Sequence, residues 1–477
     1  MRRRDFLALG GATAATTLLE PAFAQLPDFG RRFVWGTATS SYQIEGSPAR
    51  VGGGMSVWDA FCRRPGAIRD GSCGEIACDH YDRYREDVEL MRALGVGAYR
   101  FSIAWPRVMP EGVGTPNAVG LGFYDRLVDS LLAAGIEPWV TLFHWDYPEV
   151  LYKRGGWLNR DSTQWFADYA TAVVTRLSDR VTQWITFNEP EVFLVLGHHL
   201  GVHAPGDRLP WSEILRASHN VMLAHGRATV AIRATAKRSC QIGYVAALEP
   251  AIPATSQAAD VEAARRATFS GVAAWLLDPV YLGSYPESEL KSWAKDVPAF
   301  PAEDLRTIRQ PLDFFGANIY QGKLVRAGAD GNPERVARAQ GAPRTLMEVF
   351  DVVPEALQWG PRFYWERYRL PIVVTENGLS GCDWVALDGR VHDPQRIDFM
   401  ERYLGELALA RASGVDVRGY FAWSLLDNFE WAEGYRQRFG LVHVDFQSLR
   451  RTPKDSFRWY REVIRTNGAS LKGRAPR

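Results

Sequence analysis

Two short stretches of the sequence decide the fold: Ile185-Thr186-Phe187-Asn188-Glu189-Pro190 and Ile372-Val373-Val374-Thr375-Glu376-Asn377-Gly378. Each is an apolar, β-branched run that ends near a glutamate and is closed by a helix breaker. Such a run is typical of a buried parallel strand that carries a carboxylate at its own carboxyl end. In a barrel of alternating strands and helices, active sites form at that end.

The rest of the chain repeats this pattern. Strand patterns cover 33–41, 98–105, 136–145, 183–190, 241–248, 314–320, 371–378 and 417–427. Amphipathic helical patterns lie between them, among them 81–94, 122–134, 162–177, 211–235 and 396–413. Eight such units favour a parallel (β/α)8 TIM barrel over a doubly wound sheet. No linker, low-complexity tract or internal repeat divides the chain, so we expect one domain.

The longest connections all follow a strand. They cover 45–80, 321–348 and 424–446. A barrel that elaborates its strand-to-helix loops elaborates its catalytic face. The sequence therefore predicts a single-domain α/β barrel with long loops around the active site.

Composition limits the classes of partner. The chain has 477 residues, 46% of them hydrophobic and 23% charged, with a formal net charge of +1. These values describe a soluble globular protein with a large core, and they give no reason to expect nucleic acid or an anionic membrane as a partner. Seventeen tryptophans are available to stack on sugar rings, although most must belong to the core.

The amino terminus reads as a targeting segment. Arg3 and Arg4 precede Phe6-Leu7, a mildly apolar stretch follows, and Ala22-Phe23-Ala24 offers a cleavage site. This is typical of a twin-arginine export signal, too short for a membrane span. A frayed basic terminus is the alternative. We therefore predict a signal peptide over 1–24, a barrel over 25–477, and a periplasmic or secreted protein.

Cysteine and histidine spacing does not predict a metal site. Of the five cysteines, Cys73 and Cys78 are close enough in sequence for a loop disulfide, which the sequence leaves open. His198, His199 and His203 cluster without an acidic or cysteine partner, which favours a loop or pocket-rim role. We expect no metal and no cofactor.

The two glutamates suggest a chemistry. A facing carboxylate pair can cleave a glycosidic bond, because one group protonates the leaving oxygen and the other attacks or activates water. The alternative is that each glutamate is only a strand-end partner of an arginine. With the two glutamates themselves, polar groups at seven strand ends favour the first interpretation; the groups at the other five ends are Gln43, Glu45, Arg100, His144, Trp145, Asp146, Asn318, Tyr320, Trp423, Asn428, Glu430 and Trp431.

These residues fall within longer motifs that resemble a known family. The motifs are Phe33 to Gly46 (FVWGTATSSYQIEG), Tyr99 to Arg107 (YRFSIAWPR), Thr141 to Asp146 (TLFHWD), Asn188-Glu189-Pro190, Asn318-Ile319-Tyr320, Thr375-Glu376-Asn377-Gly378 and Trp423 to Trp431 (WSLLDNFEW). From residue 33 to about 460 the chain resembles glycoside hydrolase family 1, the retaining β-glucosidases.

The resemblance implies a role for each matching residue. Glu189 would be the acid/base and Glu376 the nucleophile of a covalent glycosyl-enzyme mechanism. Arg100 and Tyr320 match residues that hold the nucleophile, and Asn318 is expected to take part in substrate binding. Binding of the sugar hydroxyls falls to Gln43, His144, Asn188, Glu430 and Trp431, and Trp423 matches the aromatic floor.

Two positions narrow the expected substrate. A glutamate at 189, in place of the glutamine of thioglucosidases, implies O-glycosides. Glu430 would repel a phosphate, which implies an unphosphorylated sugar. The expected substrates are therefore small β-glycosides or short β-linked oligosaccharides, chiefly β-D-glucosides.

Three positions depart from or add to the family pattern. Phe350 stands where the family usually has a tryptophan flooring the leaving-group subsite, which bears on aglycone preference. Ile319 replaces a common tyrosine, and Glu191 is predicted to be a rim residue without a role. A non-catalytic sugar-binding protein would lack one glutamate, whereas a transglycosylase would keep both. Transfer, glycone and aglycone preference and oligomeric state stay open.

Overall fold

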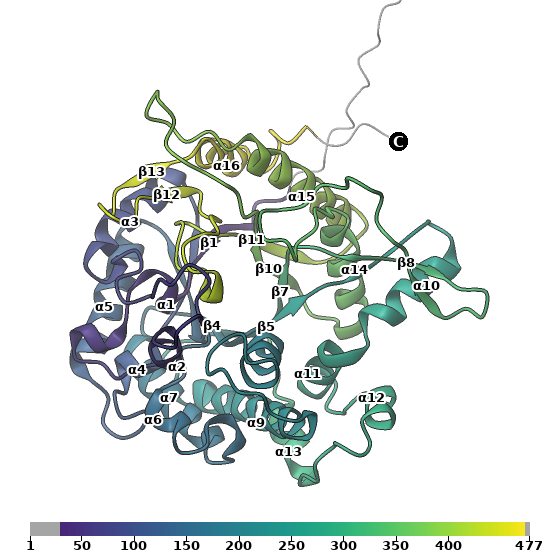
Figure 1. The fold of residues 1–477 in the computed structure, drawn as a ribbon, viewed down its shortest axis with the longest axis horizontal. Helices are drawn as coiled ribbons and strands as arrows, with labels where there is room; N and C mark the ends of the chain where they lie inside the picture. The colour runs from purple at the N-terminus through teal and green to yellow at the C-terminus, as the bar shows by residue number, and fades with distance from the viewer. Residues whose placement is uncertain (1–28, 473–477) are drawn as a thin grey trace, which may run out of the picture.

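The computed structural model describes residues 29–472, so the signal predicted over 1–24 lies outside the described residues. Eight parallel strands close into a barrel, which confirms the predicted (β/α)8 architecture (Figure 1). Around the barrel the strands follow the order β1 (Val34–Ala38), β11 (Val417–Trp423), β10 (Ile372–Asn377), β7 (Phe314–Ile319), β5 (Gln241–Leu248), β4 (Gln183–Asn188), β3 (Glu137–Phe143) and β2 (Ala98–Ser102).

All eight predicted strands are present, but most end earlier than the sequence pattern does. β4 stops at Asn188 and β3 at Phe143, although the apolar patterns run on to 190 and 145. The next residues leave the ladder because Glu189 and Trp145 adopt left-handed backbone conformations, with φ of 48° and 77°. Such conformations are uncommon outside glycine and occur at functional sites. The sequence therefore predicted the eight strands correctly but extended most of them too far at their carboxyl ends.

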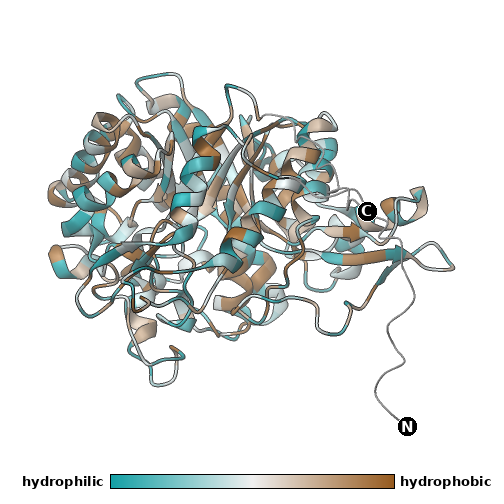
Figure 2. Cartoon of the chain, turned by 90° about the horizontal axis from the view of Figure 1, so that it is seen from above, coloured by the Kyte–Doolittle hydropathy of each residue, from teal (hydrophilic) through white to brown (hydrophobic). Residues whose placement is uncertain are grey.

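An outer ring of helices covers the barrel. Its longer members are α3 (His80–Leu94), α5 (Ala118–Ala133), α7 (Ser162–Leu177), α9 (Trp211–Thr235), α11 (Gly271–Tyr281), α14 (Ala356–Tyr368), α15 (Pro394–Ala412) and α16 (Asp455–Arg465). In α7 the buried residues Trp165, Phe166, Tyr169 and Val173 fall on one face. Figure 2 shows hydrophobic and hydrophilic residues side by side on these helices, as expected for elements that cover a core on one side.

Shorter elements fill the connections. They are α1 (Ser41–Ile44), η1 (Pro48–Val51), α2 (Val57–Cys62), α4 (Trp105–Val108), α6 (Glu149–Tyr152), η2 (Gly156–Leu158), α8 (Pro190–Val192), η3 (Phe193–His199), α10 (Ala258–Thr268), α12 (Glu287–Ser292), α13 (Ala302–Ile308) and η4 (Trp431–Glu433). A side sheet joins β6 (Ala251–Pro253), β8 (Lys323–Ala327) and β9 (Pro333–Arg335), and β12 (Val442–Val444) pairs with β13 (Arg451–Pro453). As predicted, the long loops follow β1, β7 and β11.

Large side chains fill the barrel itself. Trp139, Phe314 and Phe421 form an aromatic layer, with ring centroids 5.2 and 5.1 Å from Trp139. Two glycines make room for it: a Cβ on Gly36 would lie 2.3 Å from the Phe421 ring, and one on Gly243 would lie 2.2 Å from the Phe314 ring. The barrel is therefore a packed core, and space for a ligand is left only at its ends.

Cysteines and histidines clarify the points that the sequence left open. Cys73 and Cys78 are both free, and the buried Cys78 thiol donates to the backbone oxygen of Asp427 at 3.1 Å. His198 pairs with Asp207. Within residues 29–472, no group of three or more His, Cys, Asp or Glu side chains is arranged to hold a metal ion, and no helix is long and apolar enough to cross a membrane.

Candidate active site

The carboxyl ends of the strands open into a cavity of about 520 Å³. Nine of the predicted site residues line it: His144, Glu189, Asn318, Tyr320, Phe350, Glu376, Trp423, Glu430 and Trp431. The other three, Gln43, Arg100 and Asn188, do not line the cavity but hydrogen-bond residues that do: Glu430, Glu376 and His144, respectively. The structure therefore brings all twelve predicted residues to one end of the barrel.

Glu376, at the end of β10, is held by two donors. The Arg100 guanidinium donates to Oε1 at 2.5 Å, and the Tyr320 hydroxyl donates to Oε2 at 2.8 Å. β2 and β10 are not neighbours in the barrel, so Arg100 reaches across its interior. Burial is the largest cause and raises the pKa of Glu376 above its ordinary value, while the Arg100 charge and the hydrogen bonds from Arg100 and Tyr320 oppose that rise. This clamp favours an ionised carboxylate fixed in one orientation.

Glu189 has a different environment. It follows β4 in a left-handed conformation and accepts one side-chain hydrogen bond, from Asn318 Nδ2 at 2.8 Å. Burial and then the negative charge of Glu376 raise the pKa of Glu189 well above its ordinary value. The protonated form is therefore favoured here, while Glu376 next to Arg100 favours the charged form. Two carboxyl groups with opposed protonation are the requirement for acid-assisted glycosidic cleavage.

A network of amides links the two glutamates. Asn318 is the neighbour of Glu376 in the β7–β10 ladder, and its side chain donates to Glu189 Oε1 at 2.8 Å. It also lies close enough to Glu376 to oppose the burial that raises the pKa of that carboxyl group. Thr375 donates to Asn318 Oδ1 at 2.7 Å, which fixes the amide with its nitrogen toward the carboxyl groups. Asn188 Oδ1 accepts from Arg100 at 2.6 Å and from Asn318 at 3.0 Å. One amide side chain therefore reaches both carboxyl groups.

His144 is held neutral at the cavity wall. Burial, and then the nearby Arg100 charge, lower its pKa well below the usual value. Its Nε2 lies 3.1 Å from Asn188 Nδ2, which is a donor, so Nε2 accepts and Nδ1 carries the proton. Within the described residues Nδ1 is buried without a protein partner. The ring stacks on Trp423 and Trp431, each with its centroid 5.9 Å away.

Comparison with known proteins accounts for this arrangement. The sequence profile of glycosyl hydrolase family 1 matches residues 25–469. The chain belongs to glycoside hydrolase family 1. Beta-glucosidase A of Thermotoga maritima is 45% identical over 92% of this chain and 98% of its own length. The 1,4-beta-D-glucan glucohydrolase of Thermotoga neapolitana is 42% identical over 92% and 99%.

Solved structures agree with these sequence matches. The beta-glucosidase from Thermotoga maritima in complex with glucoimidazole superposes with a TM-score of 0.86 and 44% identity, covering 92% of this chain and 99% of that one. The complex of the same enzyme with deoxynojirimycin gives the same values. Membership of the family therefore rests on nearly the whole chain and on the fold together.

Gln43 and Glu430 meet in this family 1 site. Gln43 Nε2 donates to Glu430 Oε2 at 3.2 Å, to Asn428 Oδ1 at 3.1 Å and to the Phe429 backbone oxygen at 3.0 Å. Burial, followed by the charge of Glu376, raises the pKa of Glu430 to about 8. The pair joins the loop after β1 to the loop after β11, so neither residue is positioned by a strand alone.

The outer part of the cavity is formed by loop residues that the sequence did not identify. Phe350 lies there as the sequence indicated, and its ring stacks on Tyr320 at 5.1 Å with an interplanar angle of 8°. Around it lie apolar residues, Val192, Leu196, Val202, Leu248, Met347, Val349 and Phe439, together with polar ones, Arg69, His203, Glu249, Gln321, Glu348, Glu433 and Gln437. Trp145, seen in the sequence as a strand-end residue, also lines the cavity and donates to the Asn188 backbone oxygen at 3.0 Å.

The prediction for Glu191 is wrong. Its two carboxylate oxygens are shielded from solvent and make no side-chain hydrogen bond, and the residue does not line the cavity. It turns into the wall near Tyr244, Tyr281 and Tyr364, whose pKa values it raises. Burial raises the pKa of Glu191 to about 8. Nothing in the sequence around Glu191, which directly follows Asn188-Glu189-Pro190, indicates that its carboxyl group is buried.

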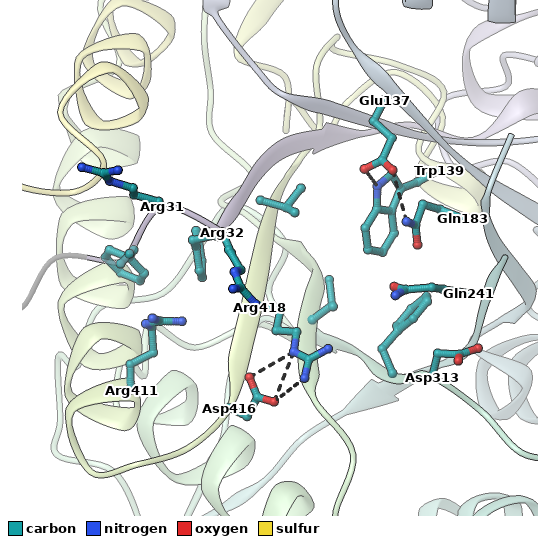
Figure 3. A pocket seen from close by; sticks show the side chains of 16 residues that line it. Arg31, Arg32, Glu137, Trp139, Gln183, Gln241, Asp313, Arg411, Asp416 and Arg418 are labelled. Carbon is teal, nitrogen blue, oxygen red and sulfur yellow. Dashed lines mark hydrogen bonds and ion pairs between the residues drawn. The ribbon is translucent and has the colours of Figure 1, made fainter. Parts of the chain in front are cut away.

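A second cavity lies at the opposite end of the barrel, where the strands begin (Figure 3). It measures about 540 Å³; in its lining Arg418 pairs with Asp416, and Glu137 accepts from Trp139 and Gln183. No pair of unpartnered carboxyl groups appears among its described residues. The glycosidic chemistry therefore belongs to the carboxyl end of the strands.

Proposed function

We propose that this protein is a retaining β-glucosidase that releases terminal β-D-glucosyl units from unphosphorylated O-glycosides. The observation that carries the proposal is the pair of glutamates joined through Asn318, one clamped by Arg100 and Tyr320, the other buried with a raised pKa. In retaining enzymes the two carboxyl groups lie about 5–5.5 Å apart, and here the Glu376 charge lies near enough to Glu189 to be the second cause, after burial, of its raised pKa. Relatives that share 42–45% identity carry β-glucosidase or glucan glucohydrolase names.

The reaction follows from these environments. Glu376 attacks the anomeric carbon as a carboxylate, while Glu189 gives its proton to the departing oxygen. The Glu376 charge is then consumed in the ester, which removes the main electrostatic cause of the raised pKa of Glu189. Glu189 is therefore a better base at the moment when it must take a proton from water. Two inversions at the anomeric carbon leave its configuration retained.

The cavity wall carries hydrogen-bond donors and acceptors that can bind the sugar hydroxyls. His144 Nδ1–H has no protein partner and lies at the wall, so it can donate to a hydroxyl. Glu430 accepts from Gln43 through Oε2 only, which leaves acceptor capacity for the outer hydroxyls. Trp423 supplies an aromatic face. Galactosyl and fucosyl units, which differ at these outer positions, are the closest competing glycones.

The aglycone subsite is proposed to favour apolar leaving groups. Phe350 and the apolar residues around it offer stacking and hydrophobic contact but few hydrogen bonds. A phenyl ring has less stacking area than an indole, and aromatic contacts of this kind contribute about 1 kcal/mol. Aryl and alkyl glucosides are therefore expected to exceed cellobiose in kcat/KM.

A panel of substrates tests the proposal. Nitrophenyl β-D-glucoside, β-galactoside and β-fucoside, their α-anomers, a 6-phosphoglucoside and cellobiose would be hydrolysed under one condition, with proton NMR of the first product. The expected result is hydrolysis of the β-glucoside, none of the α-glucoside or the phosphorylated sugar, and β-glucose formed first. Release of α-glucose first would exclude retention, and absence of hydrolysis would exclude the activity. Accumulating glycosyl-transfer products would identify a transglycosylase.

Export is proposed on the amino-terminal sequence alone. The pair Arg3-Arg4 followed by Phe6-Leu7, and the Ala22-Phe23-Ala24 site, support passage through a twin-arginine pathway to the periplasm or beyond. Replacing both arginines with lysine keeps the charge but removes the recognised pair. Precursor should then accumulate inside the cell, whereas normal processing of the variant would contradict the proposal.

A further inference from the structure

Two cysteines outside the active site lie next to each other in space. Cys62 ends α2 and Cys73 follows a loop of ten residues, and both line a surface cavity of about 420 Å³. Burial raises the pKa of the Cys62 thiol, and the Gly74 backbone N–H and the charge of Cys73 also act on it. The Cys62 sulfur therefore lies near the segment that carries Cys73. Tyr42 closes the other side, with its hydroxyl 3.7 Å from the Cys62 sulfur.

Tyr42 also explains why residue 74 is glycine. A Cβ at that position would lie 2.5 Å from the Tyr42 ring. The same ring thus contacts both Cys62 and the residue after Cys73. Cys73 is exposed and Cys62 is partly buried, whereas Cys78 is buried and already donates to Asp427. Of the three neighbouring cysteines, Cys62 and Cys73 are the two whose sulfur atoms can meet without opening the core.

We propose that Cys62 and Cys73 form a disulfide bond under oxidising conditions, and that this bond fixes segment 63–72 against the loop that carries Glu430. A disulfide needs two Cα atoms within about 7 Å and side chains that face each other. Cys62 and Cys73 line one cavity, and the Tyr42 ring contacts both Cys62 and the residue after Cys73, so the two side chains share one small region of the surface.

Segment 63–72 supports the active-site loop directly. The Arg69 amide donates to the Ala432 backbone oxygen at 2.8 Å, and the Arg69 guanidinium pairs with Glu433 at 3.2 Å. Asp70 accepts from the Tyr435 amide at 2.8 Å, and the Tyr435 hydroxyl donates to the Cys73 backbone oxygen at 2.9 Å. All of these contacts are made to residues 432–435. This stretch overlaps the turn in which the Glu430 amide donates to the Gly434 backbone oxygen at 2.7 Å.

The segment has little else to hold it. Ile68 is the one buried large apolar side chain of the segment. The contact of Arg69 with Glu433 and the hydrogen bond from the Tyr435 amide to Asp70 both lie at the surface. Polar surface contacts of this kind contribute little stability individually. A covalent closure at residues 62 and 73 would restrict the open forms of the segment and so favour the closed contacts with residues 432–435.

The chemistry is a thiol–disulfide exchange with a small-molecule or protein disulfide. Burial raises the pKa of the Cys62 thiol to about 11, so the exposed Cys73 reacts first. Its thiolate attacks the external disulfide and releases one thiol. Cys62 then loses its proton and attacks the Cys73 sulfur, which releases the second thiol. Two protein thiols become one disulfide, and one external disulfide becomes two thiols.

Peptide mapping tests the bond without reference to activity. The purified full chain would be equilibrated with oxidised glutathione, alkylated, and digested with trypsin and a glutamate-specific protease, because Glu75 separates Cys73 from Cys78. The expected product links the peptide of Cys62 to that of Cys73 and is lost on reduction. Reactive thiols in the denatured protein should fall from five to three (five minus two). A Cys78 linkage, or five remaining thiols, would overturn the proposal.

The second arm tests what the bond holds. Trypsin can cut segment 63–72 after Arg63 and Arg69, and the oxidised chain should be cut about tenfold more slowly than Cys62→Ser/Cys73→Ser, because cleavage follows local opening. Cys382→Ser, an exposed thiol elsewhere, is the matched control and should behave as wild type. The half-life of glucosidase activity on heating should lengthen several-fold on oxidation, an effect that rests on the proposed function. Equal cleavage rates would show that the bond does not brace the loop.

Discussion

The inner and outer parts of the active-site cavity are built differently. The inner part consists of residues on strands or within one residue of a strand end: Arg100, Asn188, Glu189, Asn318 and Glu376. The outer part consists of loop residues around Phe350, in 192–203, 347–350 and 431–437. Strand residues are fixed by the barrel ladder and are joined by short, charge-assisted hydrogen bonds. The outer residues are both apolar, such as Val192 and Val349, and polar, such as Gln437, and none of them carries the reaction. Substitutions there should therefore alter substrate choice while leaving the chemistry intact.

Removing the nucleophile from the inner part should have the largest effect. Glu376→Ala should lose roughly 10⁴-fold or more of kcat/KM, because no other group can form the covalent intermediate. It leaves a space beside Arg100 and Tyr320 that a small anion can fill. Added azide should restore turnover of an activated β-glucoside and yield the α-azide, detected by NMR.

Glu249→Ala is the matched control for this experiment. Glu249 is a carboxylate in the same cavity, directly after β5, and it pairs with Lys323. Its loss should change kcat/KM by less than about threefold, as for a surface ion pair. A β-azide product, or near-normal activity in Glu376→Ala, would contradict the assignment of Glu376.

Removing the acid should have the next largest effect, and one that depends on the substrate. Glu189→Gln should lower the glycosylation rate by about 10²–10⁴-fold for cellobiose, whose leaving group needs a proton, and far less for a dinitrophenyl glucoside. The alkaline limb of the kcat/KM profile should disappear for the activated substrate, because Glu189 no longer titrates. Single-turnover measurements separate this step from deglycosylation; equal losses on both substrates would reject the role.

The same pair predicts a shift that spectroscopy can observe. The charge of Glu376 is the second cause, after burial, of the raised pKa of Glu189. Glu376→Gln removes this charge but keeps the shape, so the pKa of Glu189 should fall. Carbon-13 NMR of labelled glutamate across pH, compared with wild type, measures it. An unchanged pKa would mean that the two carboxyl groups do not interact.

The contrast between inner and outer parts also explains what could be predicted from sequence. A strand leaves a periodic apolar run and delivers its last polar residue to a known end, so Glu189 and Glu376 were identifiable from two stretches of seven residues or fewer. The resemblance to a known family supplied Gln43 and Glu430, whose meeting depends on two loops. No periodicity describes how a loop folds back, so Val192 and Val349 were not foreseen.

Burial of single polar residues was equally beyond the sequence. Glu191 lies one residue past a recognised motif and was placed at the rim, yet its carboxyl group is enclosed among tyrosines from β5, α11 and α14. The direction of a side chain on a single helical turn is set by packing against distant elements. The cysteines illustrate the same limit: their spacing left a Cys73–Cys78 disulfide open, and only the structure shows that Cys78 is buried and donates to Asp427.

Phe350 tests the outer part. Phe350→Trp enlarges the aromatic surface for a sugar aglycone, so the kcat/KM ratio of cellobiose to an aryl glucoside should rise by a few-fold, up to about tenfold, equivalent to about 1.4 kcal/mol. Effects on the shared glucosyl subsite cancel in the ratio. Val349→Ala, at an exposed neighbouring position in the same cavity, controls for general disturbance of the loop. A ratio that does not move would mean that Phe350 does not contact the leaving group.

The smallest expected effect comes from Glu191, which lies outside the cavity but near Glu189. Burial raises the pKa of Glu191 to about 8, so at pH 6 it is neutral and has no charge to influence the acid. Above about pH 8 Glu191 is ionised. Its negative charge then adds to the causes that raise the pKa of Glu189, so Glu189 stays protonated to a higher pH. Glu191→Gln should therefore leave kcat/KM unchanged at pH 6 and lower it by about two- to threefold at pH 9, moving the alkaline limb downward.

Glu249→Gln serves as the matched control here, because that carboxylate lies in the cavity wall but pairs with Lys323 and does not contribute to the raised pKa of Glu189. Its pH profile should follow wild type. If Glu191→Gln lowers activity equally at both pH values, the residue acts only through packing. If only the alkaline limb moves, Glu191 acts on the catalytic acid through its charge, although it lies outside the inner part of the site. The chemistry would then depend on a residue of α8 as well as on the residues at the strand ends.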